Sequence, residues 1–245
     1  MPLLQALQAC SRVTASLYGP VRLRKQITDA LGETVFTSDV YTLIMAMQSE
    51  NAALEILKQA LVSQKMKFGS GGSTLVNLCR VLLDACCDLF RQGVSVQRIC
   101  SVLHSVQSVS QQACKRMRLP AAICLTSIES VKDREASEVA NRIADAFLRL
   151  GSTLLENTGI EADYWSSYAH VRRVHAQYHT GLEQLGPDKF FAMCPYNASK
   201  DFALLPINSY RRMDDYQAVL HAMQQAFRVL ELALIVEQYS IGGLA

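Results

Sequence analysis

Apolar residues recur at intervals of three and four along most of this chain, which is the spacing of one face of an α-helix. The longest such run lies in the first half of the chain, and its apolar positions are Leu75, Leu78, Leu82, Leu83, Cys86, Leu89 and Phe90. Similar runs predict further helices over residues 3–17, 40–47, 51–62, 96–113, 135–155 and 213–239. The chain is therefore predicted to be mostly α-helical.

Residues with known preferences for helix ends support several of these helices. Gly19-Pro20 follows the first run and should stop it, and Gly93 should end the longest run. Asp39 precedes the run over 40–47 and suits the N-cap position of a helix.

Two parts of the chain depart from the helical pattern. Short stretches over 26–28 and 34–37 flank a Leu-Gly turn, which predicts a small β-hairpin. From Gly159 to Pro206 the pattern loosens, and three of the six prolines fall there. We expect an irregular connection with only short regular pieces in this second region.

The composition is that of a globular protein and limits the partners. Half of the 245 residues are hydrophobic and 19% are charged. The net charge of +2 gives no large basic field, so we expect no nucleic-acid partner. No stretch of about 18 uncharged apolar residues occurs, so we expect no membrane span.

Cysteine usage indicates a reducing compartment. None of the eight cysteines forms a Cys-x-x-Cys pair, and most lie inside apolar helical runs, where a free thiol packs as a small hydrophobe. The first residues also lack a basic region and a clear cleavage site, so we expect no signal peptide. These features predict a cytoplasmic location.

A glycine-rich turn, GSGGST from Gly69 to Thr74, leads directly into the longest helical run. Such a junction offers unpaired backbone N–H groups to a phosphate, and Lys65 and Lys67 just before it could add positive charge. However, no Lys follows the last glycine as in a Walker A loop, and the turn has no Asp or Glu for Mg²⁺. A phosphate-binding loop and a flexible turn that caps a core helix both fit these residues.

A group of histidines and its spacing bear on whether the chain holds a metal site. His175 and His179 are four residues apart and share a helix face, and His170 lies close before them. A zinc site would need a third ligand with matching geometry, and neither a Glu after the first His nor a Cys partner is present. A polar, partly exposed helix is the favoured interpretation, and we predict no metal ligand.

Side chains that could act as nucleophiles have no suitable neighbours. Ser70, Ser73 and Cys79 have no His and acid pair placed near them, and Gly-x-Ser-x-Gly is absent, so no catalytic residue is predicted. Trp165 and its neighbouring tyrosines are interpreted as core packing, although such residues also anchor interfaces.

Motifs along residues 18–150 resemble, in order, the equatorial domain of group II chaperonins. YGPVRLRKQ resembles the family's first phosphate loop, and LGETVFTSDVYTLI resembles its hairpin and second nucleotide motif. GSGGST falls where the family has Gly-Asp-Gly-Thr-Thr-Ser, and LLDACCDLFRQGVSVQRI resembles the helices that follow. LTSIESVKDREASEVANRIADAFLRL resembles a later turn and helix, and residues 31–104 follow the family in register without gaps.

This resemblance implies three nucleotide loops in the chain. Their residues would be Gly19, Pro20, Asp39, Thr42, Gly69, Ser70, Gly71, Gly72 and Ser73. The departures from the family pattern lie in the same loops. Val21 and Arg22 replace a Lys and a Gly, and Tyr41 replaces an Ala, where it would crowd a phosphate. Ser70 replaces an acidic residue that helps to hold the metal–nucleotide, and Gly72 replaces a Thr that contacts phosphate.

These departures imply a degenerate nucleotide site. A serine cannot replace a carboxylate as a Mg²⁺ ligand without a large loss of charge stabilisation. We therefore expect no cofactor and no enzyme activity, and the alternative is ATP binding with Mg²⁺ and weak residual ATPase activity.

The resemblance also implies the architecture: a mostly α, equatorial-domain-like helical bundle with a small β-hairpin and without apical and intermediate domains. Residues 1–155 would form the N-terminal equatorial-like half, and residues 156–209 a shortened irregular connection. Residues 210–245 would form a C-terminal helix that packs back on the first half, giving one domain overall. Glu237 falls where the family carries a terminal acidic pair.

Within the family, SRVTASLYGPVRLRKQ and the altered loops are most similar to the divergent subgroup linked to McKusick–Kaufman and Bardet–Biedl syndromes. That similarity implies a cytoplasmic protein at the centrosome or ciliary basal body. Its partners would be other chaperonin-like subunits and assembly clients, and its role would be non-catalytic assistance in assembling the BBSome complex of cilia. The alternative is an ATP-binding chaperone subunit, and an unrelated helical scaffold would require the ordered motifs to be coincidence.

Overall fold

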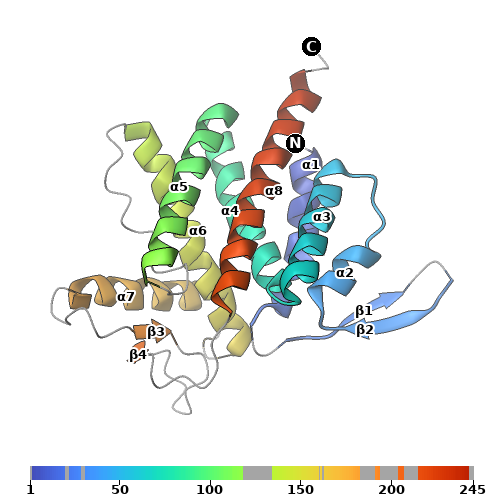
Figure 1. Ribbon diagram of the computed structural model, residues 1–245, viewed down its shortest axis with the longest axis horizontal. Helices are drawn as coiled ribbons and strands as arrows, with labels where there is room; N and C mark the ends of the chain where they lie inside the picture. Colours follow the sequence, from blue (N-terminus) through green and yellow to red (C-terminus); the bar gives the residue numbers. More distant parts are fainter. Residues whose placement is uncertain are drawn as a thin grey trace.

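The computed structural model describes residues 2–19, 22–28, 31–117, 134–159, 161, 163–182, 191–193, 204–206 and 215–242. These residues form a bundle of long helices with two small antiparallel sheets (Figure 1). The elements are α1 (Pro2–Val13), the 3-10 turn η1 (Ala15–Leu17), β1 (Lys25–Thr28), β2 (Thr34–Thr37), α2 (Val40–Ala46), α3 (Ala52–Phe68), α4 (Gly72–Arg91), α5 (Val96–Met117), α6 (Arg134–Thr158), α7 (Tyr164–Leu182), β3 (Phe191–Met193), β4 (Leu204–Pro206) and α8 (Tyr216–Gly242). The prediction of a mostly helical fold with a small hairpin is confirmed.

Helix α4 lies at the centre of the bundle, because it packs against α1, α2, α3, α5, α6 and α8. Its apolar stripe is the one that the sequence pattern identifies, and the side chains from Leu75 to Leu83 are buried except Arg80. The core continues between α6 and α8, where the buried rings of Phe147 and Phe227 lie 6.3 Å apart between centroids. Burial of these large side chains is the main source of the bundle's stability.

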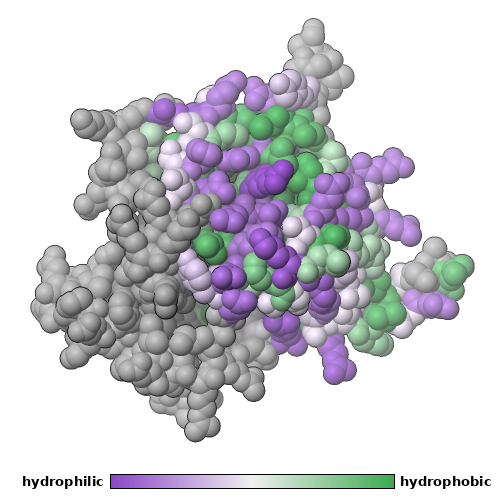
Figure 2. Space-filling model, in the orientation of Figure 1, coloured by the Kyte–Doolittle hydropathy of each residue, from purple (hydrophilic) through white to green (hydrophobic). Residues whose placement is uncertain are grey.

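Helix α8 is the second element of the core and packs against α3, α4 and α5. From Tyr216 to Tyr239 it is long and apolar enough to cross a membrane by length and composition alone, and half of the tested window is buried inside the bundle. A core helix of this kind passes the same test. Near the carboxyl end of α8, hydrophobic side chains gather on the surface (Figure 2), where Leu232, Ile235 and Tyr239 are exposed.

The β-hairpin of β1 and β2 forms where the sequence pattern predicts it. Gln26 pairs with Phe36 and Ile27 with Val35 in an antiparallel ladder, and the hairpin extends away from the helices (Figure 1). The side chains of Val35 and Phe36 are mostly exposed there. A second two-stranded sheet, in which β3 pairs with β4, was not predicted.

Helix α7 corrects the sequence analysis, which predicts an irregular connection over 156–209. Among the α7 side chains that the structure describes, Ser167, Val171 and Val174 are buried, at a helical spacing, and the helix packs on α6. Because Ser167 is polar, the apolar pattern along this helix is too sparse to detect from sequence. The prediction of a polar, partly exposed helix around His175 is confirmed. The division into stretches 1–155, 156–209 and 210–245 stays a prediction.

Two further differences concern details of the helices. Helix α3 continues to Phe68, six residues beyond its predicted end, because no helix-breaking residue occurs before Gly69. The core-packing interpretation of Trp165 is wrong, since 72% of this residue is exposed. The Trp165 ring makes edge contacts with the rings of Tyr164 and Tyr168 instead.

Candidate functional site

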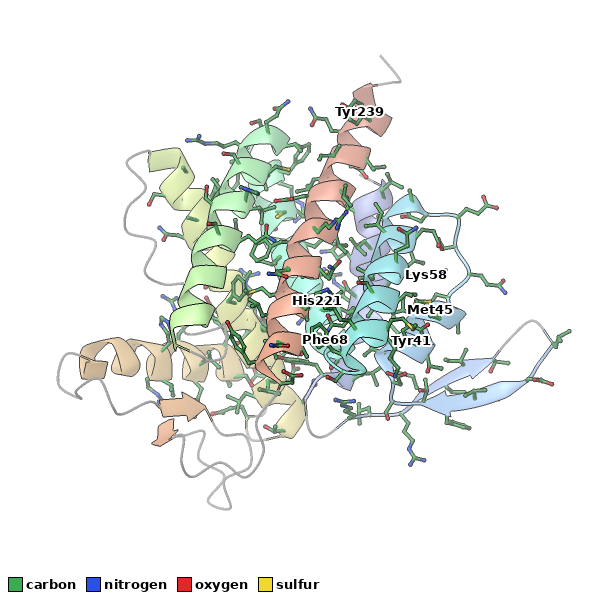
Figure 3. The ribbon with its side chains drawn as sticks, viewed as in Figure 1. Tyr41, Met45, Lys58, Phe68, His221 and Tyr239 are labelled. Atoms are coloured by element: carbon green, nitrogen blue, oxygen red, sulfur yellow. The ribbon has the colours of Figure 1, made fainter. Side chains whose placement is uncertain are left out.

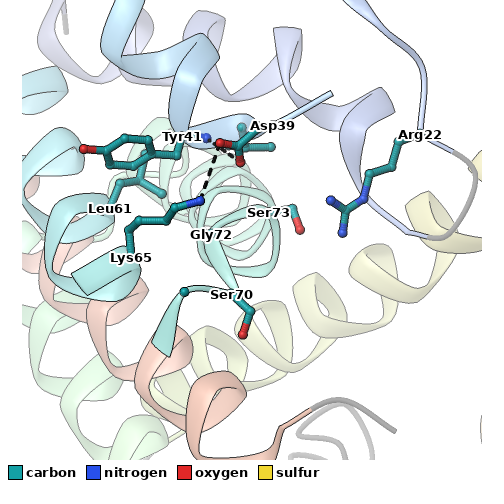
Figure 4. Close-up of a pocket in the computed structure, with 11 residues that line it drawn as sticks. Arg22, Asp39, Tyr41, Leu61, Lys65, Ser70, Gly72 and Ser73 are labelled. Carbon is teal, nitrogen blue, oxygen red and sulfur yellow. Dashed lines mark hydrogen bonds and ion pairs between the residues drawn. The ribbon is translucent and has the colours of Figure 1, made fainter. Parts of the chain in front are cut away.

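A pocket of about 160 Å³ lies where the ends of three helices meet (Figure 4). Helix α2 begins at this pocket, α3 ends beside it, and α4 begins at its base. The lining residues are Arg22, Asp39, Val40, Tyr41, Leu61, Lys65, Gly69, Ser70, Gly71, Gly72 and Ser73. Stretches that are distant in sequence therefore converge on one cavity.

The glycine loop, defined here as residues 69–73, takes its shape from two left-handed glycines. Gly69 has φ of 69° and ends α3, and Gly71 has φ of 84° and precedes the first turn of α4. Side chains other than glycine rarely adopt these angles, so the tight reversal between two helices requires both glycines. Ser70, between them, is exposed.

The first turn of α4 faces the pocket with its backbone. Gly71 provides no side-chain cap to this helix, and Gly71, Gly72 and Ser73 all line the cavity. The amino-terminal end of a helix carries a partial positive charge and N–H groups that point outward, so it favours an anion. This arrangement fits the phosphate-binding interpretation of the glycine loop better than that of a turn with only a capping role.

Asp39 supplies the carboxylate among the lining residues, and several groups already contact it. Its Oδ1 accepts a hydrogen bond from the N–H of Tyr41 at 3.4 Å, as expected for the N-cap of α2. Its Oδ2 accepts from the hydroxyl of Thr42 at 3.0 Å and lies 3.8 Å from Nζ of Lys65. The carboxylate is therefore tied to α2 and to a lysine.

Positive charge outweighs negative charge at the pocket. Lys65 and Arg22 line it, and both side chains are exposed. The Lys65 ammonium also lies 5.6 Å from the ring centroid of Tyr41, which forms one wall (Figure 4). With one carboxylate, two cations and a helix amino terminus, the lining favours an anion over a metal ion.

The structure brings together most of the predicted site residues. Asp39 and the five residues of the glycine loop line the same pocket. Thr42 lies beside it, but its hydroxyl donates to Asp39. Gly19 does not line the pocket, because it packs on α6, where an added Cβ would lie 2.7 Å from Cδ1 of Leu154. Pro20 lies outside the described residues.

Sequence reasoning missed Gln64, the polar residue that supports the glycine loop from behind. It is fully buried, and its Nε2 donates to the carbonyl of Ser70 at 2.8 Å and to that of Ala218 at 3.0 Å. A signal was available, since Leu57, Leu61 and Gln64 share one helix face. A polar residue on a buried face requires partners nearby.

Comparisons with known proteins agree with the resemblance over the part of the chain that carries the pocket. Residues 10–124, which are 115 of the 245 residues, match the TCP-1/cpn60 chaperonin family. The T-complex protein 1 subunit theta of Gallus gallus is 26% identical over 140 residues, which cover 56% of this chain and 24% of that protein. The T-complex protein 1 subunit alpha of Arabidopsis thaliana is 23% identical over 186 residues, which cover 70% of this chain and 33% of that protein.

The chain is also similar to a thermosome subunit and to one solved structure. The thermosome subunit alpha of Sulfurisphaera tokodaii is 30% identical over 92 residues, covering 38% of this chain and 16% of that protein. A crystal structure of a group III chaperonin in the open state aligns with a TM-score of 0.45 and 19% identity, covering 76% of this chain and 32% of that one.

The chain spans no more than about a third of the length of these relatives. The similarity to the McKusick–Kaufman and Bardet–Biedl subgroup stays a prediction. The hairpin, α2, the glycine loop and α4 all lie within the matched segment, and residues 10–124 are thus similar to the TCP-1/cpn60 chaperonin family and to group II chaperonin subunits.

Proposed function

We propose that this protein is a chaperonin-like interaction protein that assists the assembly of a multiprotein complex without hydrolysing ATP. The proposed lack of ATP hydrolysis rests on the contacts that the Asp39 carboxylate already makes. It is the carboxylate of the pocket lining, and its oxygens already contact Lys65, Thr42 and the backbone of α2. Hydrolysis of a nucleotide needs carboxylates that hold Mg²⁺ and position water.

Ser70 supports the same proposal. It lies at the position where the resemblance implies an acidic metal-holding residue, and the structure places it at the exposed rim of the pocket. A neutral hydroxyl there contributes no charge toward a cation. Tyr41 adds bulk to the wall where the resemblance implies a small residue.

The assembly that we propose as the client is the BBSome, with other chaperonin-like subunits as partners and a location at the centrosome or ciliary basal body. This part rests on the similarity of residues 11–26 and of the altered loops to the McKusick–Kaufman and Bardet–Biedl subgroup. Its test is depletion of the protein in ciliated cells, followed by measurement of the amount of assembled BBSome. Unchanged assembly would contradict the proposal for this client.

An ATP-binding chaperone subunit with residual hydrolysis is the second candidate function. The features that favour it are the pocket itself and the positive groups around it, namely Lys65, Arg22 and the first turn of α4. These groups could hold the phosphates of a nucleotide even where Mg²⁺ is poorly bound.

Calorimetry with ATP and ADP, with and without Mg²⁺, distinguishes the two functions. We expect no tight Mg²⁺-dependent binding by the purified chain and no release of phosphate. Tight binding of ATP or ADP, with or without Mg²⁺, that Lys65→Ala weakens would favour the second candidate. Lys58→Ala is the matched control, because Lys58 also lies on α3 but pairs with Glu55 and does not line the pocket.

A further inference from the structure

Behind the glycine loop, a buried side-chain amide joins the loop to helix α8. Gln64 of α3 has none of its surface exposed, and its amide reaches three groups. Its Nε2 lies 2.8 Å from the carbonyl oxygen of Ser70 and 3.0 Å from that of Ala218, in the first turn of α8. Its Oε1 lies 2.7 Å from Nδ1 of His221, one turn further along α8.

The direction of each of these hydrogen bonds is fixed by chemistry. Carbonyl oxygens only accept, so the Gln64 amide nitrogen must face Ser70 and Ala218. The Gln64 oxygen must then accept from His221, which requires the proton of His221 to be on Nδ1. The other ring nitrogen of His221, its Nε2, then carries no proton and can only accept. It lies 3.4 Å from Nε2 of Gln225, which can donate to it. The amide group therefore has one orientation that satisfies all its neighbours.

The surroundings of His221 hold its ring in this neutral form. Its ring packs at 5.1 Å from that of Phe68, the last residue of α3 (Figure 3). Burial, together with the charge of nearby Lys67, lowers the pKa of His221. Both effects oppose a second proton on Nε2 and so preserve its acceptor role.

An independent observation shows that the loop is packed directly on the Gln64 amide. A Cβ added to Gly71 would lie 2.6 Å from Nε2 of Gln64 and 3.3 Å from the carbonyl oxygen of Ala218. No residue with a side chain fits between the loop and this amide without a shift. Gly71 is therefore required by its φ and also by contact with Gln64.

From these contacts we propose that Gln64 and His221 are positioning residues that set the conformation of the glycine loop and couple it to the first turns of α8. Gln64 holds the Ser70 carbonyl through its buried amide, and His221 fixes the orientation of Gln64. A change in the conformation of the glycine loop therefore requires a change in the first turns of α8. A change in those turns likewise requires a change in the loop. The inference rests on the proposed function only in treating the loop as part of the site.

The coupling is tested by amide hydrogen exchange on the unliganded full chain, so the result does not depend on nucleotide binding. The variants are Gln64→Met, which keeps the length of the side chain but removes its polar atoms, and His221→Phe, which keeps a ring. We expect about tenfold faster exchange at the hydrogen-bonded N–H groups that flank the loop, those of Gly69 and Leu75, and at the N–H of Val219 in the first turn of α8. This is the size expected from loss of one or two buried hydrogen bonds. Exchange in the central part of α4 should change much less.

Two further variants separate positioning from general stability. His221→Asn retains an amide N–H that can reach Oε1 of Gln64, so it should restore slow exchange in the loop relative to His221→Phe. Gln59→Met is the matched control, because Gln59 is exposed on the same helix, and it should leave both segments unchanged. The coupling would be overturned if Gln64→Met or His221→Phe raised the exchange rate equally in all segments, or in the loop but not in α8. It would also be overturned if His221→Asn exchanged as fast in the loop as His221→Phe.

Discussion

The backbone N–H of Leu3 donates a 3.0 Å hydrogen bond to Oε2 of Glu237, so the first helix of the chain is tied to the last. The N–H of Leu4 donates to the same oxygen at 3.3 Å, and Glu237 is only 3% exposed. A carboxylate at this point satisfies N–H groups that α1 cannot pair within itself, and it complements the positive end of the helix dipole. Glu237, at the position where the resemblance implies an acidic residue, thus joins the first helix, α1, to the last helix, α8.

Replacing Glu237 with Ala should lower the free energy of unfolding by about 1–3 kcal/mol, because it leaves the N–H groups of Leu3 and Leu4 without this acceptor. Urea denaturation followed by circular dichroism measures the change. Gln238→Ala, at the exposed neighbouring position, is the control and should have little effect. Equal losses for the two variants would contradict the capping role of Glu237.

Gly71→Ala should destabilise the protein more than Gly69→Ala. Both glycines have positive φ, which costs an Ala roughly 1 kcal/mol. A Cβ at Gly71 would also collide with Gln64, whereas a Cβ at Gly69 has no atom within 4 Å. The two variants therefore share the backbone strain and differ in the contact with Gln64. Thermal melts compare them, and equal melting temperatures would show that the Gln64 contact adds nothing.

Tyr168 should contribute to stability in a way that disappears at high pH. Burial and the hydrogen bond that its hydroxyl donates to Asp145 raise its pKa from 10.0 to about 12. Since the folded pKa is above the unfolded one, this stabilisation is complete below pH 10.0 and is lost as the pH rises through about 12.

The test for Tyr168 compares the pH dependence of urea stability in the wild-type chain and in Tyr168→Phe. The two curves should converge above pH 10.0, and Tyr239→Phe, which removes an exposed hydroxyl, serves as the control for loss of a hydroxyl. Curves that stay parallel over this range would contradict the role of Asp145 as acceptor.

Ser70→Asp alone should not produce Mg²⁺-dependent ATPase activity. The added carboxylate would lie at the exposed rim, while Asp39 stays engaged with Lys65 and Tyr41 still narrows the pocket. A phosphate-release assay with and without Mg²⁺ measures turnover, and Ser63→Asp, which adds the same charge on α3, is the control. Clear turnover by Ser70→Asp but not by Ser63→Asp would overturn the proposed loss of hydrolysis.

Sequence reasoning located most of the pocket lining but not its support. The glycine loop and Asp39 were identified because turn residues and N-caps carry local signals. Gln64 was not, since its role depends on Ala218 and His221, which are more than 150 residues away in the chain. The sequence pattern indicates a helix only around His175 and not over the full length of α7 for a related reason: Ser167 is buried by packing on α6, and a serine gives no apolar signal.

The sequence by itself determined where most helices begin, where the hairpin turns, and which loops carry glycine, because these depend on neighbouring residues. The tertiary structure alone decided which of the loops share a pocket, why Gly71 tolerates no side chain, and that Glu237 caps α1. These features arise from contacts between residues distant in the chain, and such contacts exist only once the apolar faces of α4 and α8 have packed together.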